Sequence, residues 1–125
     1  MSAQGTERDT ERIEHILDAA DFLATLVGQG REVFDSSRER RNAVERLLEI
    51  VGEAAGQMSG GFAAAYPDLD LAGARDLRNV IIHGYMNVDD DLLWDAAASS
   101  VPALAAGLRA AAGLDPSADR PGPDF

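Results

Sequence analysis

One stretch of eight residues organises this chain: RNVIIHGY, from Arg78 to Tyr85. It places an arginine, an amide, a histidine and a phenol between two predicted helices, and Gly84 within it is a natural helix stop. Arginine binds phosphoryl oxygens through a planar fork of donors, and histidine exchanges protons near neutral pH. The stretch therefore predicts a helix end that carries residues suited to phosphate chemistry.

Around this stretch, apolar residues recur every three or four positions over four segments, which is the pattern of amphipathic helices. The predicted helices run from about Glu7 to Val27, from about residue 37 to Met58, from Leu71 to Ile82, and from about Val88 to Gly113. The sequence shows no strand pattern and no internal repeat. The prediction is an all-α fold, an antiparallel up-and-down bundle of four to five helices.

Capping and helix-breaking residues separate the predicted helices. Asp35 and Ser36 can cap the second helix, and Asp68 and Asp70 can cap the third. Residues 62–66 add at most a short turn of helix before a proline. Pro102 lies inside the fourth segment and predicts a kink or a break there.

The third helix is expected to bury one apolar face, and the second to approach a neighbour closely. The predicted buried face consists of Leu71, Ala74, Leu77, Val80 and Ile81. A glycine inside a helix costs about 1 kcal/mol relative to alanine, so Gly52 predicts close helix packing.

Length and composition indicate one small domain. We expect residues 7–113 to form it, with a flexible N-terminus (1–6) and a disordered C-terminal tail (114–125) rich in Pro, Asp and Gly. No apolar run approaches the ~20 residues of a membrane span, and residues 1–12 are too charged for a signal peptide. With no cysteine, disulfides are excluded and a cytoplasmic protein without membrane contact is expected.

The charge balance is strongly acidic, with 22 acidic and 11 basic residues and a formal net charge of −11. This argues against an extended basic surface for nucleic acid. A local positive cleft stays open as an interpretation, because arginines cluster at positions 38, 40, 41 and 46 and again at 75 and 78. The first cluster is predicted to be a solvated helix face paired with Glu39, Glu45 and Glu49, and a phosphate-attracting groove is the alternative.

Metal and cofactor chemistry is not predicted. The chain has no Glu-x-x-His, no His-x-x-x-His, no Walker loop and no Gly-x-Ser-x-Gly. On an ideal helix Arg78 and His83 diverge by about 140°, so they converge only if the helix distorts near His83 or a second chain completes the site. Spacing alone also allows a helix end stabilised by His83, with Tyr85 as a half-buried aromatic. The other histidine, His15, is predicted to be a surface residue.

The wider sequence resembles the HEPN superfamily, in its HepT-like toxin branch. The resemblance rests on LRN (77–79), HGY (83–85) and VD (88–89), supported by AVER (43–46), VGEA (51–54), YP (66–67), Trp94 and VPAL (101–104). It covers about residues 8–112. One departure is the pair Asp70-Leu71, where relatives often carry a Pro-Trp-like pair, and it concerns packing more than chemistry.

This resemblance implies a homodimeric toxin of a type II/VII-like toxin–antitoxin system, a metal-independent endoribonuclease that cleaves RNA through an Arg-x4-His motif. Arg78 and His83 would be catalytic, and Asn79 a polar helper. Two residues of the resembling stretches, Glu53 and Arg46, are added as supporting residues. Tyr85 would be the site to which a cognate minimal nucleotidyltransferase antitoxin transfers AMP.

The sequence is also compatible with two other functions. The chain could be a non-catalytic, HEPN-like subunit that docks on a nucleotidyltransferase and holds a nucleotide near Arg78 and His83, which suits its acidic composition. It could also be a structural helical dimer with no site.

Overall fold

The computed structural model describes residues 3–84 and 88–113, with side chains from Glu7 onward. The helices are α1 (Ala3–Gly28), α2 (Arg31–Ser36), α3 (Arg38–Gly56), α4 (Gly60–Ala65), α5 (Leu71–His83), α6 (Asp90–Asp95) and α7 (Val101–Ala111), with a π-helical turn, η1 (Ala96–Ser100), between α6 and α7. No strand occurs in these two ranges. The all-α prediction is confirmed.

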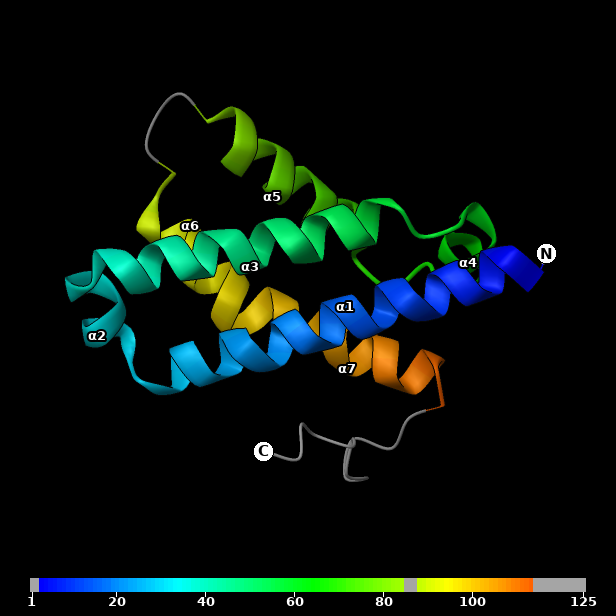
Figure 1. Ribbon diagram of the computed structural model, residues 1–125, viewed down its shortest axis with the longest axis horizontal. Helices are drawn as coiled ribbons and strands as arrows, with labels where there is room; N and C mark the ends of the chain where they lie inside the picture. The colour runs from blue at the N-terminus through cyan, green and yellow to red at the C-terminus, as the bar shows by residue number, and fades with distance from the viewer. Residues whose placement is uncertain (1–2, 85–87, 114–125) are drawn as a thin grey trace.

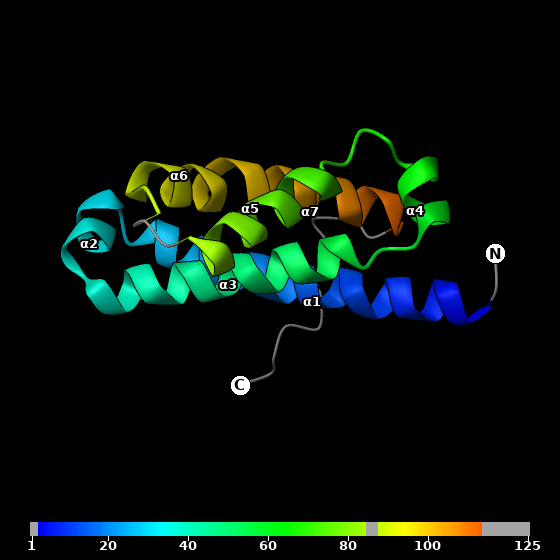
Figure 2. The same cartoon turned by 90° about the horizontal axis from the view of Figure 1, so that it is seen from above.

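The long elements alternate in direction along the chain. In Figure 1, α1 runs back towards α2, α3 returns beside it, α5 reverses again, and α6, η1 and α7 form the last leg. The short helices α2 and α4 lie at opposite ends of the bundle, as Figure 2 also shows. The predicted antiparallel up-and-down bundle is confirmed.

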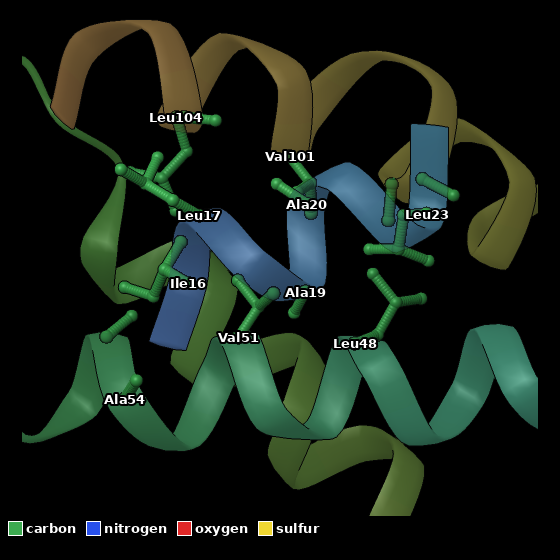
Figure 3. Packing of buried hydrophobic residues seen from close by; sticks show 14 of the residues in the cluster. Ile16, Leu17, Ala19, Ala20, Leu23, Leu48, Val51, Ala54, Val101 and Leu104 are labelled. Carbon is green, nitrogen blue, oxygen red and sulfur yellow. The ribbon is translucent and has the colours of Figure 1, made fainter. Parts of the chain in front are cut away.

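The hydrophobic core lies where α1 packs between α3 and the α6–η1–α7 leg. Figure 3 shows α1 side chains directed both ways, towards α3 and towards the last helix. The labelled core residues are Ile16, Leu17, Ala19, Ala20 and Leu23 of α1, Leu48, Val51 and Ala54 of α3, and Val101 and Leu104 of the last leg. Full burial of such an aliphatic side chain stabilises the fold by about 1.5–3 kcal/mol.

Some helix ends differ from the sequence expectation. Helix α1 begins at Ala3, earlier than the predicted Glu7. The cap of α3 is Ser37, whose hydroxyl accepts a hydrogen bond from the Arg40 N–H at 3.2 Å, whereas Asp35 and Ser36 lie inside α2. A short α2 was missed by the periodicity because six residues span less than two helical turns.

The boundaries of α5 and the break in the last helix follow the prediction. Asp70 caps α5 by accepting a hydrogen bond from the Gly73 N–H at 2.9 Å, and Gly84 is the cap at the other end. Pro102 is the second residue of α7 and has no N–H to donate, so the helix widens into η1 just before it.

The predicted buried face of α5 is confirmed except at Val80. Leu71 is buried, and Ala74, Leu77 and Ile81 are partly buried and pack against the core, whereas Val80 is 50% exposed. The physical reason is that α5 packs mainly on α3 (Figure 1), and Val80, two residues after Arg78, points about 160° away from the side of α5 that meets Gly52. None of the helices described is long and apolar enough to cross a membrane.

Candidate active site

The candidate site lies on α5, which is placed by a close approach to α3. A Cβ atom built on Gly52 would overlap the Cβ of Arg78 and lie 2.5 Å from the carbonyl oxygen of Ala74. The predicted close packing at Gly52 is therefore confirmed, and the α3 residue directly beneath Arg78 has no side chain.

Arg78 is half-buried, and its guanidinium is bound to a neutral group. Its Nη1 donates a hydrogen bond to Oδ1 of Asn79 at 3.1 Å. Within residues 3–84 and 88–113 no carboxylate pairs with Arg78, whereas Arg75, one turn earlier, binds Asp76 at 3.2 Å. The structure thus brings Arg78 and its predicted helper Asn79 together and leaves the guanidinium available to an anion.

His83 is the last residue of α5 and is exposed. The helix continues to this residue, so Arg78 and His83 are rotated apart by about 140° and separated by about 7.5 Å along the axis. Within one chain the two predicted catalytic residues therefore face different directions. Tyr85 lies outside the described residues.

The predicted supporting residues on α3 are not joined to this pair. Arg46 is exposed and binds Glu49 at 3.4 Å, and Glu53 is exposed. In the part of the chain that the structure describes, no hydrogen bond or ion pair links Arg46 or Glu53 to Arg78 or His83. His15 is exposed on α1, as predicted for a surface histidine.

One arginine of the α3 cluster, Arg41, holds two elements together. Arg41 binds Asp90, Glu45 and the carbonyl oxygen of Val88, which ties α3 to the start of α6. The hydrogen bond to Asp90 is the largest of the influences that raise the pKa of Arg41. Sequence reasoning missed this role, because the carboxylate partner lies 49 positions away.

Two hollows lie beside α5 and its connection to α6. An apolar cleft of about 190 Å³ separates α5 from the last leg and is lined by Leu48, Val51, Asp70, Gly73, Ala74, Leu77, Leu92, Asp95, Ala96, Ser100, Val101 and Leu104. A polar hollow of about 570 Å³ is lined by Arg38, Arg41, Asn42, Val88, Asp89 and Asp90. Among the described residues no group of three His, Asp or Glu side chains could hold a metal ion.

Comparison with known proteins identifies the family. The family model described as ribonuclease HepT-like matches residues 16–111, which include α5 and most of the bundle. The chain belongs to the HepT-like ribonuclease family. This confirms the resemblance that the motif residues predicted, and it places Arg78 and His83 inside the matched region.

Relatives of this HepT-like chain have ribonuclease names. The chain is 29% identical over 90 residues to "Putative RNase MJ0127" of Methanocaldococcus jannaschii, covering 72% of each protein, and 35% identical over 71 residues to "Putative RNase MJ1380" of that organism, covering 57% of this chain and 65% of the relative. It is 27% identical over 95 residues to "Probable ribonuclease HepT" of Thermococcus cleftensis, covering 73% and 86%. No solved structure matches the chain.

Proposed function

We propose that this HepT-like chain is a metal-independent endoribonuclease that cleaves RNA through Arg78 and His83. The observation that carries the proposal is the state of Arg78, a half-buried guanidinium bound to an amide and to no carboxylate in the described ranges. An RNA phosphate can take the place that a carboxylate would otherwise hold.

The chemistry requires three groups. Attack by the 2′-hydroxyl of RNA on the adjacent phosphorus needs a base at that hydroxyl, stabilisation of the phosphorane, and an acid at the leaving oxygen. His83 supplies the base and Arg78 the positive charge, and His83 of the second chain or a water supplies the acid that protonates the leaving oxygen. Because one chain turns these residues about 140° apart, a homodimer that brings Arg78 of one chain near His83 of the other is the economical arrangement.

The apolar surface of α5 supports a homodimer. Among the described residues, the exposed large hydrophobic side chains include Val80 and Ile82 of α5 and Leu92 of α6, and Leu92 also lines the apolar cleft. Burying this surface against a second copy would remove it from water. Val80→Asp is expected to convert the dimer to a folded monomer in light scattering, and an unchanged dimer would show that this surface is not the interface.

The proposed biological role is that of a toxin, neutralised by a minimal nucleotidyltransferase antitoxin that adenylylates Tyr85. Tyr85 is two residues from His83 in the sequence, so an added phosphate and adenosine would repel and block an RNA phosphate. Tyr85→Phe should keep RNA cleavage and lose AMP incorporation in the presence of the antitoxin and ATP. AMP on the residue-85 peptide of that variant would contradict this role.

The alternative is a non-catalytic subunit that docks on a nucleotidyltransferase, and the net charge of −11 favours it. An acidic surface suits a protein partner better than free RNA. The two functions differ in one result, since only the first predicts RNA cleavage by the chain alone.

The deciding experiment compares RNA cleavage by purified protein in EDTA. Wild type should cleave single-stranded RNA, and His83→Ala and Arg78→Ala should each lower the rate about 100-fold or more. Arg75→Ala and His15→Ala are matched controls, because both residues are exposed and neither belongs to the proposed site. Expression in cells should arrest growth for wild type and the two control variants, and it should not do so for His83→Ala or Arg78→Ala. No cleavage by wild type would favour the docking subunit, and equal cleavage by all variants would place the site elsewhere.

A further inference from the structure

The close approach of α3 and α5 depends on two glycines of α3, Gly52 and Gly56. They are four residues apart, so they lie on the same side of the helix, which is the side that α5 covers (Figure 1). The two positions differ in what an added methyl group would meet.

At Gly52 the methyl group would meet atoms that cannot move independently of α5. It would overlap the Cβ of Arg78 and lie 2.5 Å from the carbonyl oxygen of Ala74, and one of these atoms is bonded to the α5 backbone while the other is part of it. Gly52 is buried, so the methyl group has no other direction in which to go. Only a shift of α5 away from α3 relieves the overlap.

At Gly56 the methyl group would meet a flexible side chain. Its nearest neighbours would be Cγ and Cδ of Arg75, at 3.0 and 3.3 Å. Arg75 and Gly56 are both exposed, so the arginine can rotate without moving α5. Gly56 is therefore a matched control on the same helix face.

We infer that Gly52 is a positioning residue for Arg78 in the proposed ribonuclease site. With no side chain at position 52, the aliphatic stem of Arg78 rests directly on α3, and its guanidinium is held beside Asn79. Glycine inside a helix is unfavourable relative to alanine, and the close approach offsets that cost. The inference rests on the proposed function, because it assigns the position of a residue that the proposed reaction uses.

The size of the effect follows from the overlap. Ordinary van der Waals contact begins at 3.4 Å, so relief of a 2.5 Å contact with Ala74 moves α5 outward by about 1 Å. A displacement of about 1 Å in a catalytic group can lower a rate about 100-fold. We therefore expect Gly52→Ala to lower kcat about 100-fold with a smaller change in KM, and Gly56→Ala to leave kcat within about threefold of wild type.

The test is a double-mutant cycle on RNA cleavage by the full chain. The variants are Gly52→Ala, Arg78→Ala, their combination, and Gly56→Ala, each verified as folded by circular dichroism and thermal unfolding. If Gly52 acts mainly through Arg78, Gly52→Ala causes a much smaller loss when Arg78 is already alanine, because only the displacement of the rest of α5, including His83, then remains. A role limited to stability would lower both rates by the same factor.

Each outcome supports or overturns the inference. The non-additive result together with an active Gly56→Ala supports it. Wild-type kcat in Gly52→Ala, additive losses, or failure of Gly52→Ala to fold where Gly56→Ala folds would each overturn it. Full activity of Arg78→Ala would instead refute the proposed function itself, so the two failures are distinguishable.

Discussion

The substitution Asp9→Ala is expected to destabilise the fold, because Asp9 links α1 to the start of α4. Asp9 is 3% exposed, and its carboxylate accepts two hydrogen bonds from Ser59, one from the backbone N–H at 2.9 Å and one from the hydroxyl at 2.5 Å. The same hydroxyl accepts a hydrogen bond from the Phe62 N–H and so caps α4. Asp9 thereby ties α1 to the turn that leads towards α5.

The magnitude follows from these two bonds. A hydrogen bond to a charged group contributes about 1.5–3 kcal/mol, and the partial exposure of Ser59 lets water replace part of what the carboxylate provides. We expect Asp9→Ala to lower the free energy of unfolding by about 2–4 kcal/mol. For a domain of this size the corresponding fall in Tm is about 10–20 °C.

The assay is urea unfolding followed by far-UV circular dichroism. Asp9→Ala should shift the midpoint without changing the m-value. Glu14→Ala, an exposed acidic residue of the same helix, is the control and should change stability by less than about 0.5 kcal/mol. Because Asp9 and Ser59 share the same bonds, Asp9→Ala and Ser59→Ala together should cost less than the sum of the two. A loss below about 0.5 kcal/mol, or full additivity, would refute the reasoning.

Two further substitutions test the core and the tie between α3 and α6. Leu48→Ala, at a side chain that is 2% exposed, should cost about 2–5 kcal/mol in the same assay. Leu92→Ala, at a side chain that is 44% exposed, should cost clearly less, and equal losses would contradict the assigned core. Arg41→Gln removes the ion pair to Asp90 and weakens the link to the Val88 carbonyl, so amide hydrogen exchange should accelerate in residues 90–95 and not in α7. Unchanged exchange at residues 90–95 would mean that Arg41 does not hold the start of α6.

The sequence predicts those elements whose physical cause is local. Stripes at helical spacing predict α1, α3 and the last leg, because each buries one face on a neighbour. Asp70 and Gly84 predict the ends of α5 through short-range hydrogen bonding and helix termination, and Pro102 predicts the break that appears as η1. The burial of Asp9 could also have been predicted from the sequence, because Asp9 lies four residues before Ile13 and extends the buried stripe of α1.

Periodicity fails where burial depends on how many neighbours a helix has. The apolar stripe of α5 packs against the core at Leu71, Ala74, Leu77 and Ile81, yet Val80 is left half in solvent. The spacing of apolar residues shows that a helix has an apolar face, but it does not show whether the surface that covers this face belongs to the same chain. For the same reason the spacing of Arg78 and His83 indicated divergence without showing what would bring them together.

The two proposed catalytic residues, Arg78 and His83, are positioned by different contacts. The position of Arg78 is determined inside the chain, by contact with Gly52 of α3. His83 lies exposed at the end of the helix. If a second copy covers the neighbouring apolar surface, it also determines what His83 faces. In the proposed enzyme, cleavage would then require the homodimer even though each chain folds with its own Arg78 in place.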